Sequence, residues 1–265
     1  MDLALEGKTA VVTGASKGIG LALARALSDH GVNVVAASRS VTDELAELAG
    51  RSGVVHEAVD LGTADGPGRA VARALSEFGG LDILVNNVGV SLPREGFLSL
   101  SDEDWDSSWR VNFLSAVRAC RVAIPAMLES GGGSIINITS LNSRQPHPMV
   151  VEYGAAKAAL TNLTKALSEE FAGRNVRVNA IAPGFVRTPM WTEPGGFGEH
   201  VARLTGAADA AEVIEKVAPE MLGISVGRFA EPDHLCGLAL LLASDQAAMM
   251  TGAEYLVDGG VSKTL

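Results

Sequence analysis

Residues 8–31, with the sequence KTAVVTGASKGIGLALARALSDHG, constrain the fold of this chain most strongly. The apolar run Ala10–Val12 is typical of a buried parallel strand, and a helical pattern begins near Gly18. Gly14, Gly18 and Gly20 follow a G-x3-G-x-G spacing that lets the backbone turn tightly and approach a phosphate. The free N–H groups and positive dipole end of the helix favour such an anion. The stretch therefore predicts a nucleotide-binding loop, and a glycine turn without a ligand is the alternative.

Short apolar runs continue to alternate with helical patterns along the chain. The predicted strands are Thr9–Val12, Asn33–Ala37, Val54–Ala58, Ile83–Val85, Ser134–Ile138, Arg177–Ile181 and Tyr255–Val257. The predicted helices are Gly18–His30, Thr42–Gly50, Ala64–Phe78, Asp102–Glu129, Val151–Ala172 and Pro232–Ala243. We therefore predict an α/β fold of Rossmann type, a doubly wound parallel sheet of about seven strands with helices on both faces. Residues 1–265 are expected to form one domain.

Composition argues against several classes of protein. The apolar fraction of 47% and the 30 glycines fit a compact α/β chain and not a disordered one. A net charge of −10 argues against nucleic acid or an anionic membrane surface as a partner. Cys120 and Cys236 lie in apolar contexts typical of buried thiols, and the five histidines show no ligand spacing, so we expect no metal. Without a signal peptide or an apolar run near 18 residues, we expect a cytoplasmic protein.

Tyr153, Lys157 and Ser140 carry the most specific chemical signal. Lys157 follows Tyr153 by four positions, so on a helix the two side chains share a face. The positive charge is expected to lower the pKa of the phenol and fit it to exchange a proton with a substrate oxygen. Ser140 could hold that oxygen by a hydrogen bond. Since most Tyr-x3-Lys pairs are ordinary amphipathic helix faces, the pair is informative only together with the nucleotide-binding loop.

The motifs of the chain, taken in order, resemble the short-chain dehydrogenase/reductase family over nearly its whole length. They are Thr13-Gly14-x3-Gly18-Ile19-Gly20, Asp60-Leu61, Asn86-Asn87-Val88-Gly89, Asn112, Ser140, Tyr153-x3-Lys157, Pro183-Gly184 and Asp258-Gly259-Gly260. Val88 stands where the family usually has Ala. Within the family, the chain resembles single-domain, NADP(H)-preferring members similar to 3-oxoacyl reductases.

The resemblance implies a dinucleotide cofactor and the residues that bind it. These are Gly14, Ser16, Lys17, Gly18, Ile19, Gly20, Ser38, Arg39, Asp60, Leu61, Asn87, Gly89, Tyr153, Lys157, Pro183, Gly184, Val186 and Thr188. An acidic residue after the second strand would bind the ribose 2′-hydroxyl of NAD, but none occurs before Asp43. Arg39 and Lys17 offer positive charges suited to a 2′-phosphate. We therefore predict NADP(H), and the alternative is that both are ordinary surface cations.

The resemblance further implies an oxidoreductase of a ketone/secondary alcohol pair, with Asn112, Ser140, Tyr153 and Lys157 as catalytic residues. Tyr153 is the acid–base residue, Lys157 lowers its pKa and holds the nicotinamide ribose, and Ser140 positions the substrate oxygen. Asn112 holds a water linked to Lys157, or is a helix-kinking or capping amide. Because NADPH generally drives reduction, we expect ketone reduction. The alternatives are a non-catalytic nucleotide-binding sensor or scaffold, and a family epimerase or dehydratase.

Residues 188–228 are expected to form a substrate lid. They read as a long irregular segment that mixes Gly and Pro with Met, Trp and Phe, and a solvent-exposed insertion or an oligomer contact is the alternative. The predicted substrate-pocket residues are Leu141, Gln145, His147, Val150, Phe185 and Trp191. They suggest a mostly apolar site for a small carbonyl or alcohol, such as a 3-oxoacyl thioester, a polyketide-type ketone, a steroid or a sugar-derived ketone.

Two long predicted helices, Asp102–Glu129 and Val151–Ala172, carry more apolar residues than one inward stripe needs. The extra residues include Phe113, Leu114, Leu160 and Leu163. Similar proteins are commonly tetramers built on these helices. We therefore predict a homotetramer, with a dimer as the alternative.

Overall fold

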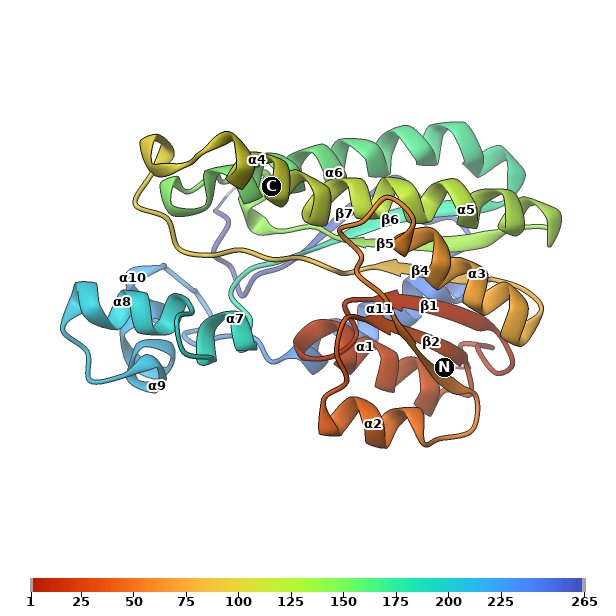
Figure 1. Ribbon diagram of the computed structural model, residues 1–265, viewed down its shortest axis with the longest axis horizontal. Coiled ribbons are helices and arrows are strands. Elements are labelled where there is room, and N and C mark those ends of the chain that lie inside the picture. The colour runs from red at the N-terminus through yellow and green to blue at the C-terminus, as the bar shows by residue number, and fades with distance from the viewer. Residues whose placement is uncertain (1, 264–265) are drawn as a thin grey trace.

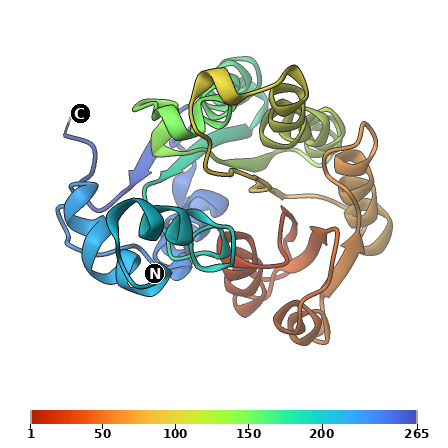
Figure 2. The same ribbon diagram turned by 60° about the vertical axis from the view of Figure 1, so that its left-hand side comes forward.

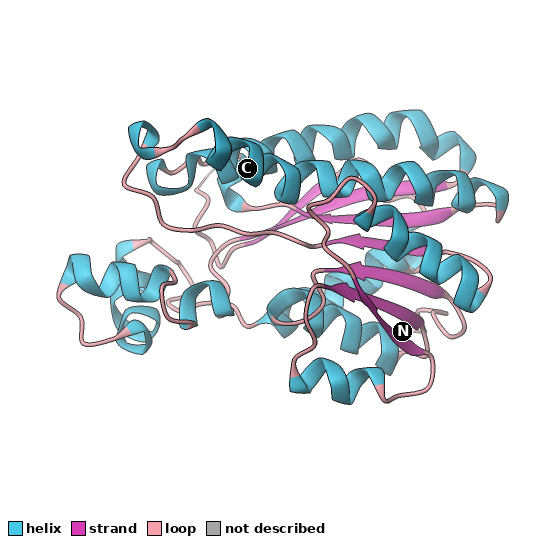
Figure 3. Ribbon diagram, in the orientation of Figure 1, coloured by secondary structure: helices cyan, strands magenta, loops and turns pink. Residues whose placement is uncertain are grey.

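A parallel seven-stranded sheet forms the centre of the computed structural model, which describes residues 2–263 (Figure 3). Its strands are β1 (Thr9–Thr13), β2 (Asn33–Ser38), β3 (Val54–Ala58), β4 (Ile83–Asn86), β5 (Gly133–Ile138), β6 (Val176–Pro183) and β7 (Glu254–Val257). They pair in the order β3-β2-β1-β4-β5-β6-β7, with Val11 opposite both Val35 and Leu84. Every predicted strand is confirmed. The strand order reverses between β1 and β4, and ligands bind at such a switch point, beyond the carboxyl ends of the strands.

Helices cover both faces of the sheet (Figure 1). α1 (Gly18–Asp29) and α11 (Cys236–Ala243) pack on one face, and α3 (Gly66–Phe78), α5 (Ser115–Glu129) and α6 (Val151–Phe171) pack on the other. α2 (Asp43–Ala49) lies beside β3. Successive strand residues face opposite sides, so Val12 enters the first core and Val11 the second. Burial on both faces is the reason why the strands are almost continuously apolar.

Both cysteines are buried free thiols, as the sequence predicted. Burial raises the pKa of the Cys120 thiol to about 12 and that of the Cys236 thiol to about 11. Because the thiolate is the nucleophilic and metal-binding form of cysteine, we expect neither residue to react at neutral pH.

The predicted helix Asp102–Glu129 is present but contains an irregular turn. α4 (Asp102–Trp109) leads into the π-helical turn η2 (Arg110–Leu114), and α5 continues to Glu129. Among residues 2–263 this is the one helix long and apolar enough to cross a membrane, judged by length and composition alone. It is a core helix, since Ala119 and Ala123 are fully buried against the sheet. The widened turn carries Asn112 toward the carboxyl end of β4.

Residues 187–229 fold into a helical subdomain (Figure 2). The prediction that this segment is irregular is therefore wrong. Its helices are α7 (Pro189–Thr192), α8 (Phe197–Thr205), α9 (Ala210–Glu212), η6 (Val213–Val217) and α10 (Ala218–Met221). Glycine and proline keep these helices short. The rings of Phe185, Trp191 and Phe229 pack between them with centroids 4.9 to 5.8 Å apart. Burial of this aromatic cluster stabilises turns that are too short to be stable alone.

The two ends of the helical subdomain are fastened to each other. Val186 and Ala230 form an isolated parallel β-bridge. The amide of Arg187 donates to the carbonyl of Ala230 at 2.8 Å, and the amide of Ala230 donates to the carbonyl of Phe185 at 2.9 Å. The Arg187 guanidinium also pairs with Glu231 at 3.0 Å. The chain therefore leaves and rejoins the sheet-bearing part of the molecule at a single point.

Candidate active site

A cavity of about 540 Å³ lies at the carboxyl ends of β1, β4 and β5, between the glycine loop and the helical subdomain. Its lining includes every residue that the sequence predicted to bind the cofactor, from Gly14 after β1 to Thr188 before α7. Ser140, Tyr153 and Lys157 line the same cavity. The fold thus brings together motifs that are far apart in the chain.

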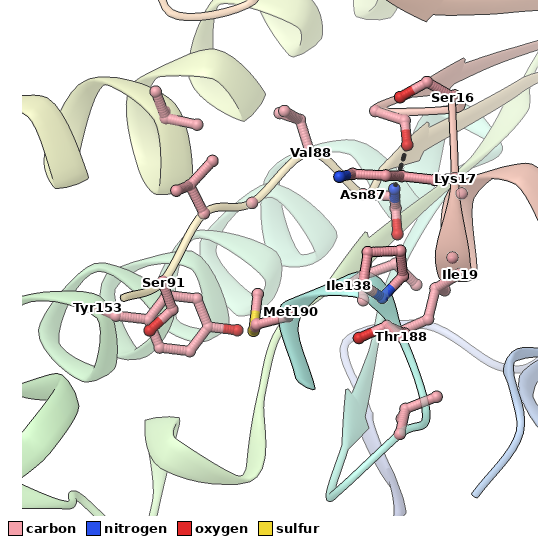
Figure 4. Close-up of a pocket in the computed structure, with 18 of the residues that line it drawn as sticks. Ser16, Lys17, Ile19, Asn87, Val88, Ser91, Ile138, Tyr153, Thr188 and Met190 are labelled. Atoms are coloured by element: carbon pink, nitrogen blue, oxygen red, sulfur yellow. Dashed lines mark hydrogen bonds between the residues drawn. The ribbon is translucent and has the colours of Figure 1, made fainter. Parts of the chain in front are cut away.

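The loop after β1 is shaped by its glycines and by Asn87. Gly14 has a φ of +68°, and a Cβ atom at Gly20 would lie 2.3 Å from the Gly14 carbonyl oxygen, so both positions require glycine. Asn87 Nδ2 donates to the same carbonyl at 3.2 Å and ties the end of β4 to the loop (Figure 4). α1 begins with no side-chain cap from Lys17. Its first N–H groups are therefore available to an anion in the cavity, which fits the phosphates of a dinucleotide.

The two cations predicted to recognise a 2′-phosphate differ in their surroundings. Arg39 follows β2, lies exposed at the rim of the cavity and forms no ion pair within residues 2–263. Lys17 instead donates to both carboxylate oxygens of Glu193 in the helical subdomain, at 2.7 and 2.8 Å. Both members of this pair are about half exposed, so the pair is weak and Lys17 can exchange its partner.

Tyr153, Ser140 and Lys157 meet where β5 and α6 form the wall of the cavity. Ser140 follows β5, its Oγ accepts from the amide of Asn142 at 3.1 Å, and it shares a hydrogen bond with the Tyr153 hydroxyl. Lys157 is 2% exposed, and its Nζ donates to the carbonyl of Ile138 at 2.8 Å. The same Nζ lies 5.7 Å from the centre of the Tyr153 ring. The three groups form one continuous polar cluster.

Burial governs the protonation of this cluster. It raises the pKa of the Tyr153 phenol above 10.0, and the hydrogen bond with Ser140 acts in the opposite direction. It lowers the pKa of Lys157 to about 8. The predicted lowering of the Tyr153 pKa by Lys157 is therefore not found, because the ammonium is itself desolvated and is directed to the carbonyl of Ile138. The phenol is protonated at neutral pH, and this form can donate a proton to a carbonyl oxygen.

Asn112 clamps the loop that follows β4. Its side chain is 1% exposed, its Oδ1 accepts from the amide of Val90 at 2.9 Å, and its Nδ2 donates to the Val90 carbonyl at 2.9 Å. Nδ2 also lies 3.1 Å from Ser108 Oγ. The π-helical turn η2 places the amide here, and such turns are frequent at functional sites. These contacts favour a positioning role, and the water relay through Asn112 stays a prediction.

The predicted substrate pocket matches the cavity at only one residue, Trp191. The cavity lining does not include Leu141, Gln145, His147, Val150 or Phe185. Leu141, Gln145, His147 and Val150 lie on or between the 3-10 turns η3 (Leu141–Ser143) and η4 (Pro148–Val150) that follow Ser140, whereas Phe185 follows β6. Gln145 donates to Ser262, His147 accepts from the amide of Met149, and Val150 and Phe185 join the aromatic cluster of the subdomain.

Other residues that line the cavity were not predicted. They include Val90, Ser91, Leu92, Val111, Pro189, Met190 and Glu193. Ser91 continues the chain just beyond the Asn-Asn-Val-Gly motif, so its position after a strand end could have identified it. Figure 4 shows Ser91 and Tyr153 on one side of the cavity and Ser16 and Lys17 on the other. Met190 and Glu193 come from α7 and its end, and their placement depends on how the whole subdomain docks.

Comparisons with known proteins agree with this geometry. A family model described as short chain dehydrogenase matches residues 8–199. The 3-oxoacyl-[acyl-carrier-protein] reductase FabG of Chlamydia muridarum is 34% identical over 99% of this chain and 100% of its own length. D-threitol dehydrogenase of Mycolicibacterium smegmatis is 35% identical over 98% of this chain and 94% of its own. L-sorbose reductase of Gluconobacter frateurii, solved with NADPH and L-sorbose, has a TM-score of 0.90 at 37% identity, with both chains fully covered. The chain therefore belongs to the short-chain dehydrogenase/reductase family and is an oxidoreductase of carbonyl or alcohol substrates.

Proposed function

We propose that this protein is an NADP(H)-dependent reductase that converts a ketone to a secondary alcohol, and that it acts in the cytoplasm. One observation carries the proposal: Ser140, Tyr153 and Lys157 line a single cavity whose rim presents the exposed cation Arg39. Two of the similar proteins are named as reductases, and one of them is described with NADPH. The reductase names favour the reducing direction, and the structure with NADPH favours the phosphorylated cofactor.

Each of the reactive residues in the cavity has its own role in this reaction. Bound NADPH supplies the hydride. The Ser140 hydroxyl holds the carbonyl oxygen, and the protonated Tyr153 hydroxyl donates a proton to it. Lys157, with a pKa of about 8, is positively charged at neutral pH, and its ammonium is the group that holds the nicotinamide ribose of the bound cofactor. Trp191 and the helical subdomain cover the cavity and exclude water, which strengthens each of these interactions.

The test uses purified protein, NADPH and a panel that holds a ketose, a 3-oxoacyl thioester and simple aliphatic ketones. We expect stoichiometric loss of NADPH absorbance with at least one ketone. In Tyr153→Phe, turnover should fall by about 10²- to 10⁴-fold while NADPH binding is kept, because only the proton donor is lost. Tyr255→Phe is the matched control, since the other tyrosine of the chain lies on β7, outside the cavity lining.

Three outcomes would contradict the proposal. NADPH binding without turnover of any panel member would favour the sensor or scaffold. Product formation without net change in the nicotinamide would favour an epimerase or dehydratase. Turnover in Tyr153→Phe close to that of the unmodified protein would exclude Tyr153 as the proton donor.

A further inference from the structure

Glu254 is a buried carboxylate that the proposed reaction does not use. It is the first residue of β7, and its side chain is 4% exposed. Its Oε1 accepts from the hydroxyls of Thr139 at 2.9 Å, Ser143 at 3.2 Å and Thr161 at 2.6 Å, and its Oε2 accepts from the Arg144 guanidinium. A carboxylate is retained in such a place only when several donors replace its hydration. Glu254 is therefore the centre of a complete network.

The donors belong to the two elements that carry the reactive groups. Three of them lie within four positions of Ser140, on both sides of it in the chain. The fourth lies on α6, one helical turn beyond Lys157, and the same helix carries Tyr153. Glu254 itself comes from a third element, β7. Its carboxylate thus holds the loop of Ser140 against the helix of Tyr153 and Lys157.

The loop lies directly against α6 at the place where Ser140 meets Tyr153. The carbonyl of Asn142 rests on α6 so closely that a Cβ atom at Gly154 would lie 3.2 Å from it. Gly154 is the neighbour of Tyr153 in the chain, so movement of the loop along α6 changes the relation of Ser140 to the phenol. A misplacement of about 1 Å at a reacting centre costs on the order of 100-fold in rate.

We propose that Glu254 is a positioning residue, which acts through Ser140 by locking the loop of residues 139–144 onto α6. The inference rests on the proposed function, because the group it positions is the one that holds the carbonyl oxygen. A carboxylate is needed here and not merely a side chain of this shape, since it alone accepts from all four donors without presenting a donor of its own.

Glu254→Gln tests this role with little change in volume. We expect kcat to fall about tenfold or more, because the loop shifts relative to Tyr153. NADPH affinity should stay within about twofold, since no residue of the network except Thr139 lines the cavity. Glu57→Gln is the matched control, because Glu57 is also a partly buried carboxylate paired with an arginine, Arg69, but it lies on β3 at the opposite edge of the sheet. It should leave kcat unchanged.

A double-mutant cycle separates positioning from general destabilisation. If Glu254 acts through Ser140, then Ser140→Ala with Glu254→Gln loses no more activity than Ser140→Ala alone. Independent losses that multiply, or an unchanged kcat in Glu254→Gln, would overturn the proposal. Hydrogen exchange gives a readout without turnover: amides 139–145 should exchange faster in Glu254→Gln, with those of α1 unchanged. If the unmodified protein reduces no ketone, the proposed function fails, and equal exchange of amides 139–145 would then refute the positioning role separately.

Discussion

The pKa of Lys157 depends strongly on the surroundings of its side chain. Its ammonium is buried, its hydrogen-bond partner is the carbonyl of Ile138, and its pKa falls to about 8 from 10.5. The group therefore remains charged at neutral pH, but holding the charge there costs stability. Such a cost is typical of functional sites, where a residue is kept for its chemistry and not for its contribution to folding.

Because burying the charge of Lys157 costs stability, the free energy of unfolding should depend on pH. Between pH of about 8 and 10.5 the unfolded chain holds the Lys157 proton more tightly than the folded protein, so the contribution of Lys157 to the free energy of unfolding rises with pH. Across that window the rise is on the order of 3 kcal/mol. Lys157→Met should abolish it. Chemical denaturation of both proteins at several pH values measures the difference, and a difference that does not change with pH would contradict this assignment.

Arg39 is expected to determine the preference for NADPH over NADH. Arg39→Asp removes the exposed cation at the cavity rim and places a negative charge beside the expected 2′-phosphate. The ratio of kcat/KM for NADPH over NADH should fall by about tenfold or more, which corresponds to about 1.4 kcal/mol. Arg25→Asp is the control, because it changes the net charge equally at an exposed position of α1 outside the cavity. An unchanged ratio in Arg39→Asp would leave Lys17, released from Glu193, as the discriminating cation.

Single elements differ in how far the sequence predicts them. The strands, α1 and α6 are recovered because local apolar patterns and long-range packing agree there. The short helices of residues 187–229 are missed because their stability comes from Trp191 and its aromatic neighbours, and not from local propensity. Leu141, Gln145, His147 and Val150 lie outside the cavity lining for a related reason, because closeness to Ser140 in the chain does not say which way η3 and η4 turn. Their contact with a substrate stays a prediction. Nothing local marks Glu254, because all four of its donors are distant in the chain.

If residues 188–228 act as a lid over the cavity, Trp191 is the residue expected to contact the substrate. Trp191 is 8% exposed and belongs to both the aromatic cluster and the cavity lining. Trp191→Ala should raise KM severalfold or change substrate preference, because it removes an apolar wall of the cavity. NADPH affinity should change little. Leu204→Ala, an exposed position on α8 of the same subdomain, is the control.

Hydrogen exchange tests the movement of the lid directly. We expect amides of residues 189–221 to become more protected when cofactor and substrate are both present, since closure buries them. Equal protection with and without the ligands would refute a mobile lid, even if Trp191 contacts the substrate.

The whole molecule is expected to be a homotetramer built on α4, α5 and α6. Trp109 and Phe113 form an aromatic pair with centroids 4.8 Å apart, and Trp109 and Val122 are partly exposed. Leu160 does not contribute to this surface, because it is buried within the subunit. Light scattering at micromolar concentration should give four chain masses. Val122→Asp should lower the mass by placing a charge in the apolar contact, and a monomer for the unmodified protein would contradict the assembly.

The bridge between Val186 and Ala230 bears on how far the segment between them can vary in length and sequence. Because the bridge fixes the distance between the two ends, the chain between them behaves as a closed loop whose closure entropy changes only slowly with length. We therefore expect that residues 187–229 can be replaced as a unit. A segment of another length and composition could be grafted between these two anchor points and present a new wall to the same hydride path, without disturbing the register of a single strand.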